Sequence, residues 1–195
     1  WQMFGGTEQI YAKQGNTMGI FRNMSSRQKF FLILTILWMV VIFFFFFRPG
    51  SVSEQDSGRV GLLIGEIFVP GFEDWSEAEQ QAFAETVDHP VRKTAHASEY
   101  ALLGILAAGA CIENGRDLRR RRTEIFIPWL TATVYAATDE FHQLFIPGRS
   151  GQVSDVLLDS AGALAGVLIL AGVRYVWMSK KRKESVTEKK KGQEA

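Results

Sequence analysis

Cysteine is nearly absent from this chain, because Cys111 is the only cysteine among its 195 residues. A single cysteine excludes an internal disulfide framework and any zinc site that needs several cysteines. The catalytic spacings H-E-x-x-H and G-x-S-x-G are missing too, and the chain contains no internal repeat. An excess of one charge is also lacking, since 22 Lys and Arg residues balance 21 Asp and Glu residues to a net charge of +1. The long apolar runs and 15 phenylalanines, in turn, exclude a disordered chain.

Four apolar segments predict four membrane-spanning helices, at residues 30–47, 94–112, 125–146 and 156–177. The first is an apolar run of 18 residues, unbroken apart from Thr35, and it is just long enough to cross a hydrocarbon core of about 30 Å. A secretory signal peptide is the alternative for this run, but Arg48-Pro49-Gly50 indicates a helix end and no small-x-small cleavage site follows. For the other three segments, the alternative is a set of buried helices in a soluble domain.

The basic residues are concentrated in residues 1–29, 113–124 and 174–195, which hold 17 of the 22. These stretches alternate with non-basic ones across the four apolar segments, as the positive-inside rule requires. We therefore expect an all-α integral membrane protein with four transmembrane helices and both termini in the cytoplasm. The basic tail is expected to attract anionic lipid headgroups; nucleic acid is not expected as a partner, because the tail has no interleaved aromatic residues.

The predicted organisation is a cytoplasmic segment at residues 1–29, a membrane domain at residues 30–178 and a basic cytoplasmic tail at residues 179–195. Because residue 1 is Trp and not Met, we expect the natural start to lie elsewhere and give residues 1–22 little weight. Residues 48–92 form an acidic outer loop. In it, Ser76-Glu77-Ala78-Glu79 has capping-box spacing and predicts a short helix to about residue 87, ended by His89-Pro90. Residues 59–72 are apolar but too short to span, which is typical of a re-entrant or interfacial piece.

Polar residues gather at the predicted outer ends of the second, third and fourth helices. Lys93, His96 and Tyr100 share one helix face, at i, i+3 and i+7. The other members are Asp139, Glu140, Gln143, Arg149, Asp155 and Asp159. Ionisable groups inside a membrane cost about 2.5–3.5 kcal/mol each, so we expect these side chains to face a common pocket. The alternative is a mutually satisfied polar core that only joins the helices.

The spacing of these polar residues does not decide which chemistry they perform. Carboxylates beside His96 suit acid–base catalysis, although nothing in the pattern requires it. Ligand types for a metal are present but metal-binding spacings are not, so no metal and no other cofactor is expected. Arg149 is expected to pair with Asp155 or to bind a phosphate or carboxylate of a ligand. Gly162 and Gly166 have the G-x-x-x-G spacing that predicts a close helix contact.

Three spaced elements resemble the VanZ-like family, over about residues 30–178. The matching residues are Lys93, His96 and Tyr100 for K-x-x-H-x-x-x-Y; Asp139, Glu140, Gln143 and Arg149 for D-E-x-x-Q and the P-G-R after it; and Asp155, Asp159 and Gly162 for D-x-x-x-N/D-x-x-G. The position that is often Asn in the family is Asp159 here, which adds a negative charge. The resemblance implies a small multi-pass protein of bacterial, often Gram-positive, cell membranes. The founding member is linked to teicoplanin resistance, so the resemblance implies a phenotype and not a reaction.

We therefore expect an outward-facing pocket that handles an anionic or polar envelope component, such as a lipid-linked precursor or a headgroup. His96, Asp139 and Glu140 are the candidates for proton transfer or orientation. The candidate binding residues are Lys93, Tyr100, Gln143, Arg149, Asp155 and Asp159. Two classes stay open: a protein that masks an envelope component and contributes to teicoplanin resistance, and an intramembrane enzyme that modifies an envelope lipid or polymer. A transporter is disfavoured because four helices leave little room for alternating access.

Overall fold

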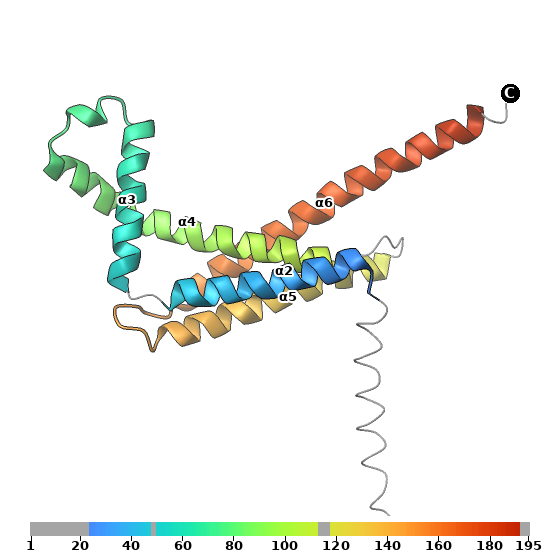
Figure 1. The fold of residues 1–195 in the computed structure, drawn as a ribbon, viewed down its shortest axis with the longest axis horizontal. Coiled ribbons are helices and arrows are strands. Elements are labelled where there is room, and N and C mark those ends of the chain that lie inside the picture. The colour runs from blue at the N-terminus through green and yellow to red at the C-terminus, as the bar shows by residue number, and fades with distance from the viewer. Residues whose placement is uncertain (1–23, 48–49, 113–117, 192–195) are drawn as a thin grey trace, which may run out of the picture.

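The computed structural model describes residues 24–47, 50–112 and 118–191, and the regular structure in these ranges is entirely helical (Figure 1). In chain order, the elements are α2 (Ser26–Phe46), α3 (Gly50–Phe68), the short 3-10 helix η1 (Phe72–Asp74), α4 (Glu77–Cys111), α5 (Leu118–Gln143) and α6 (Val153–Lys191). The predicted all-α class is confirmed. Most of the predicted segment 1–29, part of the basic loop 113–124 and the last four residues of the tail lie outside the described residues.

Four long helices, α2, α4, α5 and α6, form a bundle along a common axis, and α3 stands across one end of it (Figure 1). Helix α4 packs against each of the other four α-helices described. Asp155 of α6 pairs with Lys93, and Arg174 further along α6 bonds Ile112 at the end of α4, so these two helices run parallel. Arg27 at the start of α2 bonds the same Ile112 carbonyl, so α2 runs antiparallel to α4. The short turn at residues 144–152 makes α5 antiparallel to α6.

Glycines bring the backbones of α4 and α6 into direct contact, as the G-x-x-x-G spacing predicts. A Cβ atom at Gly162 would overlap the backbone of Ala97, and one at Gly166 would overlap the backbone of Ala101. Gly104 makes the corresponding contact from α4. Small residues at a helix interface in a membrane allow this close approach, and a larger side chain would separate the helices.

Small and apolar side chains fill the core beside this contact. Its buried members are Ile42, Tyr100, Leu103, Ala132, Ala136 and Ala163. Aromatic side chains around them keep their polar atoms bonded: the Trp129 indole N–H donates to the Ser160 hydroxyl at 3.0 Å, and the Tyr135 hydroxyl donates to the Met39 carbonyl at 2.6 Å. A buried Trp or Tyr is stabilised when its polar atom has such a partner.

The outer surface of the bundle is strongly apolar. Among the described residues, two helical stretches are long and apolar enough to cross a membrane: Ser26–Phe45 and Val153–Ser185. Only 11% of the apolar window of the first is buried, and Phe30 and Phe44 on it are 59% and 65% exposed. The core helix of a soluble protein would be mostly buried, so this surface indicates membrane association.

Residues 50–92, in the predicted outer loop, fold into a hairpin of α3 and the first part of α4. The predicted capping box is present: the Ser76 hydroxyl accepts from the Glu79 N–H, and the Glu79 carboxylate accepts from the Ser76 N–H at 2.9 Å. Hydrogen bonds from the Ser76 hydroxyl and N–H lower the pKa of Glu79. Residues 59–72 supply the second half of α3 and the start of η1, and Gly61 brings this helix close to the backbone of Ala84 on α4.

The predicted end of the outer helix at His89-Pro90 is wrong, because α4 continues through Pro90 to Cys111. A proline inside a helix removes one hydrogen bond and costs about 3 kcal/mol. Contacts of the neighbouring turns offset this cost: the Asp88 carboxylate accepts from the Ser57 hydroxyl of α3 and pairs with Arg92 at 2.7 Å. The Asp88–Arg92 pair is a local i, i+4 contact, whereas the contact with α3 is tertiary and no local pattern contains it.

Helix α6 also extends beyond its predicted span of residues 156–177 and reaches Lys191. The additional turns are rich in lysine, arginine and glutamate, which favour helix even without packing. Where they begin, the Lys181 ammonium lies 4.3 Å from the centre of the Trp177 ring, within cation–π range. The basic tail is thus a helical continuation of α6 as far as it is described.

Candidate functional site

A polar pocket opens at the end of the bundle where α4, α6 and the α5–α6 turn meet. Its volume is about 140 Å³. Six of the predicted site residues line it: Lys93, His96, Gln143, Arg149, Asp155 and Asp159. Glu140 lies beside them, because one of its carboxylate oxygens is within 4.8 Å of the nearest donor atoms of His96 and Asp159. Side chains that are up to 66 residues apart in the sequence therefore meet at one end of the bundle.

Local structure positions each of these groups. Lys93 and His96 lie one turn apart on α4, and Gln143 is the last residue of α5. In the turn that follows, Gly148 has φ of 75°, in the left-handed region that favours glycine, and the Arg149 N–H donates to the Ile146 carbonyl at 3.2 Å. This tight turn directs the chain back into α6 and brings Arg149 to the pocket.

Lys93 on α4 and Asp155 in the first turn of α6 form an ion pair, in which the Lys93 ammonium donates to Asp155 Oδ1. The side chains are 31% and 24% exposed, so water screens part of their attraction. The sequence predicted that Arg149 pairs with Asp155 or binds a ligand, and it did not predict this pairing of Asp155 with Lys93. Because it joins two parallel helices at the rim of the pocket, the pair fixes the separation of their ends.

Glu140 is held by hydrogen bonds on both oxygens. Gln143, one turn later on α5, donates to Oε1 at 3.1 Å, and the backbone N–H of Gln152 donates to Oε2 at 2.9 Å. The side chain is only 5% exposed. Gln143 therefore acts as a positioning residue for Glu140, and the α5–α6 turn closes over the carboxylate.

Tyr100 and Asp139 form a separate pair deeper in the bundle and do not line the pocket. The Tyr100 hydroxyl donates to Asp139 Oδ2 at 3.3 Å, and the two residues are 0% and 4% exposed. Asp139 Oδ1 is buried and has no hydrogen-bond partner in the part of the chain that the structure describes. Two of the predicted site residues thus lie behind the pocket, in the layer that supports it.

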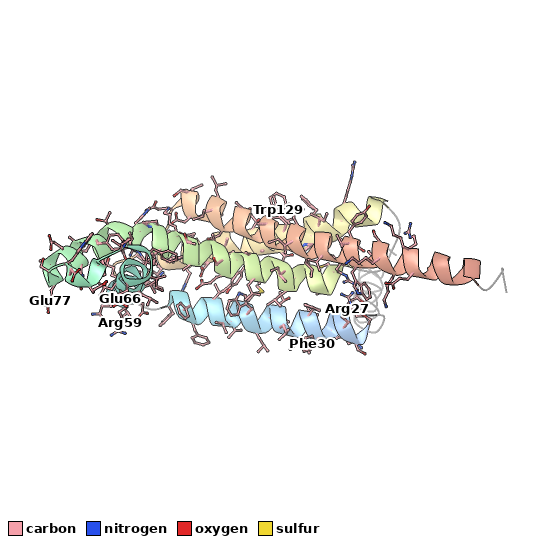
Figure 2. All side chains as sticks on the ribbon, turned by 90° about the horizontal axis from the view of Figure 1, so that it is seen from above. Arg27, Phe30, Arg59, Glu66, Glu77 and Trp129 are labelled. Carbon is pink, nitrogen blue, oxygen red and sulfur yellow. The ribbon has the colours of Figure 1, made fainter. Side chains whose placement is uncertain are left out.

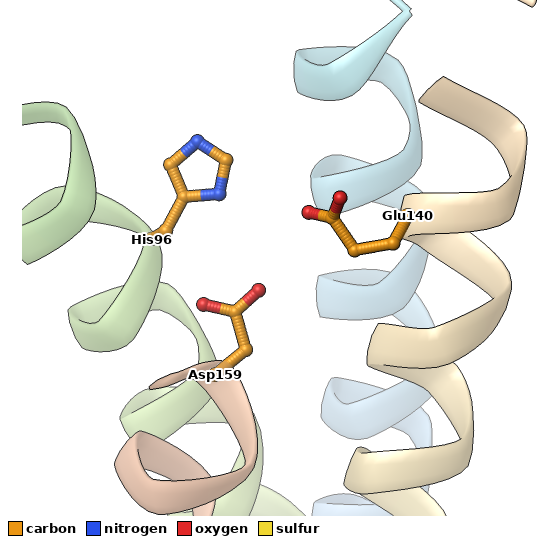
Figure 3. Close-up of side chains that lie close together, drawn as sticks. All are labelled: His96, Glu140 and Asp159. Carbon is orange, nitrogen blue, oxygen red and sulfur yellow. The ribbon is translucent and has the colours of Figure 1, made fainter. Parts of the chain in front are cut away.

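His96, Glu140 and Asp159 converge from three different helices (Figure 3). Each offers one atom that lies within 4.8 Å of the other two. Asp159 is only 1% exposed, and within the described ranges its Oδ1 atom accepts no hydrogen bond. An imidazole beside two carboxylates at this spacing suits proton transfer or ligation of a cation.

A second, largely apolar groove adjoins the polar pocket. Its volume is about 540 Å³, and it lies between the end of α2, the start of α3 and α4. Phe45, Val60, Val91 and Ala95 supply apolar walls, while Arg92, His96, Glu99 and Arg149 lie at its polar side. Because His96 and Arg149 line both cavities, a molecule with a polar and an apolar part could occupy the two together.

At the opposite end of the bundle, two arginines join α2 and α6 to the end of α4 by hydrogen bonds. The Arg27 guanidinium donates to the carbonyls of Gly109 at 3.3 Å and Ile112 at 2.6 Å, and Arg174 donates to Ile112 at 3.1 Å. Arginines at the end of α4 also interact favourably with its helix dipole. Figure 2 shows Arg27 at this end of the molecule, far from Arg59 and Glu77 at the other.

Several residues at the site were not assigned a role from the sequence. Arg92 and Ser53 line the pocket, and the Gln152 backbone N–H holds Glu140. The adjacency of Arg92 to Lys93 is the one pattern that pointed to it. Ser53 reaches the pocket because α3 packs across the bundle end, which no local spacing indicates. The role of the Gln152 backbone N–H could not be predicted, because every residue except proline has such a group.

The VanZ/LLP1 family profile matches residues 31–175. No curated protein and no solved structure matches the chain. The matched region contains most of α2, all of α3, α4 and α5 and the first part of α6, together with every residue of the polar pocket. This chain belongs to the VanZ/LLP1 family.

Proposed function

We propose that the chain crosses the membrane four times, with α2, α4, α5 and α6 as the spans. The bundle packing supports this, because α4 and α5 lie alongside two helices that are apolar enough to span. Helix α5 also presents Ile127, Val134 and Phe141 outward, at 47%, 55% and 64% exposure. Such an apolar outer surface fits lipid better than water.

Both termini would be cytoplasmic and the polar pocket would face outward. Arg27 and Arg174 lie at the same bundle end, and Arg122 together with the basic tail belongs to the same side. The positive-inside rule assigns this end to the cytoplasm. The pocket, about 24 Å away along the 16 residues of α4 between Lys93 and Gly109, then lies near the outer headgroups.

In this orientation the pocket binds the headgroup of an anionic or polar envelope component, such as a lipid or a lipid-linked precursor. The observation that carries this proposal is the presence of Lys93, His96 and Arg149 in one cavity at the end of a membrane bundle. Ammonium and guanidinium groups are the usual partners of phosphate and carboxylate. The apolar groove next to Arg149 offers a place for an acyl or polyprenyl chain. By masking such a component, the protein would contribute to resistance against teicoplanin-type glycopeptides.

A second candidate is an intramembrane enzyme that modifies the bound component. The juxtaposition of His96, Glu140 and Asp159 favours it, because a histidine beside two buried carboxylates can accept and return a proton. Tyr100 and Asp139 would then support this cluster from behind.

Two labelling sites test the topology. In a Cys111→Ala background, Ser150→Cys places a thiol in the α5–α6 turn and Arg122→Cys places one at the basic end; both positions are exposed. A membrane-impermeant maleimide on intact cells should label the first and spare the second. Labelling of the second alone would refute the outward pocket.

Function is tested in cells that express the wild type, Arg149→Gln or His96→Ala, with Arg122→Gln as a matched control at the other end. We expect the wild type and the control to reduce binding of fluorescent teicoplanin, and the two pocket variants to lose this effect. Mass spectrometry of envelope lipids and wall polymers from the same cells separates the classes. Unchanged chemistry supports masking, whereas a covalent change lost in His96→Ala supports the enzyme. Equal teicoplanin binding and equal chemistry in all strains would refute both.

A further inference from the structure

The cluster of His96, Glu140 and Asp159 contains a buried carboxylate oxygen that no described hydrogen-bond donor compensates. Asp159 Oδ1 is buried without a hydrogen bond from the described residues, in a side chain that is 99% buried. Figure 3 shows this carboxylate directed into the space between His96 and Glu140. Buried carboxylates are normally compensated by donors or by a cation, because desolvating an uncompensated charge is costly.

The donors of the cluster are also held in place for a ligand. Both Glu140 oxygens accept hydrogen bonds, from Gln143 and from the Gln152 backbone. Outer-shell hydrogen bonds of this kind orient metal-ligating carboxylates. Lys93 is already paired with Asp155, so that lysine does not neutralise Asp159. Arg149 lines the same pocket and would compete with a cation for these carboxylates.

We infer that His96, Glu140 and Asp159 bind one divalent transition-metal ion of the Zn²⁺ or Mn²⁺ class. The site is one imidazole nitrogen and two carboxylate oxygens, with the remaining positions open to the pocket. Metal bonds of about 2.0–2.2 Å separate neighbouring ligand atoms by about 3–4 Å, so atoms now within 4.8 Å need only small side-chain rotations. The imidazole selects against Mg²⁺ and Ca²⁺, which prefer oxygen ligands alone.

This site does not depend on the identity of the envelope component. His96 and Asp159 both line the pocket, so an ion held there would present its open positions to whatever the pocket binds. A bound phosphate or carboxylate would then become a further ligand. Metal binding by the unliganded protein nevertheless tests the cluster alone.

The test uses the full chain, purified in detergent, stripped with a chelator and dialysed against Zn²⁺. Elemental analysis should find about one Zn²⁺ per wild-type chain. Asp159→Asn keeps the shape of the side chain but removes its charge, and His96→Gln removes the nitrogen ligand. Each should weaken Zn²⁺ binding by at least about 10-fold, since even outer-shell changes have effects of this size. His142→Gln, which changes a histidine of α5 outside the pocket lining and outside the cluster, should bind as the wild type does.

Thermal unfolding gives a second readout that also reports on folding. Zn²⁺ should raise the Tm of the wild type and of His142→Gln, with little effect on His96→Gln, and Mg²⁺ should leave all three unchanged. Wild-type protein that retains no Zn²⁺, or variants at positions 96 and 159 that bind it as the wild type does, would overturn the inference. If Asp159→Asn does not fold, the comparison of His96→Gln with His142→Gln decides.

Discussion

The pair behind the pocket allows a quantitative prediction, because the Tyr100 hydroxyl is the one described donor to the Asp139 carboxylate. The bond measures 3.3 Å, and Asp139 Oδ1 already has no partner. Replacing Tyr100 with Phe would leave both oxygens of a 4%-exposed carboxyl group without a donor. Stranding a buried polar group costs about 1–3 kcal/mol, and more if it is charged. We therefore expect Tyr100→Phe to lower the free energy of unfolding by about 2 kcal/mol, at the middle of this range.

Tyr135→Phe is the matched control, since it also removes one hydroxyl from the same core. Its hydroxyl bonds the Met39 carbonyl of α2 at 2.6 Å, and a carbonyl inside a helix keeps its intrahelical donor. The control should therefore cost only about 0.5–1 kcal/mol, the net value of an ordinary hydrogen bond. Equilibrium unfolding in mixed micelles, followed by circular dichroism, measures both variants.

A double-mutant cycle with Asp139→Asn isolates the pairwise term. Residues in direct contact show coupling energies of about 0.5–3 kcal/mol, so the double variant should be less destabilised than the sum of the single variants. The reasoning is refuted if Tyr100→Phe costs no more than Tyr135→Phe, or if the two positions behave additively.

Two further predictions concern packing and capping. Gly166→Val should destabilise the bundle by about 1–3 kcal/mol, because its Cβ would overlap the Ala101 backbone. Gly172→Ala on the same helix is the control: its Cβ meets nothing within 4 Å, so the change should be neutral or slightly stabilising. Thermal unfolding of the two variants side by side checks this prediction. Ser76→Ala should cost about 1 kcal/mol by removing the helix cap. Because the hydrogen bonds from Ser76 lower the pKa of Glu79 in the folded state, the contribution of Glu79 should be present near neutral pH and lost as the pH falls through that lowered pKa, so the Tm difference from wild type should shrink in acid.

Much of the fold follows from composition and spacing. Each of the four predicted apolar segments lies largely within one long helix. A helix pairs all backbone N–H and C=O groups of such a run within the segment itself, which an apolar environment requires. The G-x-x-x-G spacing also located the α4–α6 contact correctly, since close approach needs small residues and Gly162 and Gly166 are small on one face.

What the sequence missed was decided by contacts between distant segments. Pro90 carries the local pattern of a helix end, and the hydrogen bond from Ser57 of α3 to Asp88 is the distant contact that helps the helix to continue. The partner of Asp155 was missed for the same reason. Arg149 is its neighbour along the chain, but Lys93 is its neighbour across the parallel α4–α6 contact. Chain direction in a bundle is a tertiary property, and no spacing within one helix reveals it.

That parallel contact explains how the bundle can carry a polar pocket without losing its fold. Asp155, Asp159, Gly162 and Gly166 form one stripe along α6, with spacings of four, three and four residues. The two carboxylates lie at the pocket and the two glycines lie deeper, against the α4 backbone. One face of α6 therefore has two functions at different positions. The glycines in the middle of the face hold α6 against the α4 backbone, and the side chains at its end line the pocket. For this reason, an isosteric change at Asp159 should alter binding far more than stability, whereas changes at the glycines should do the reverse.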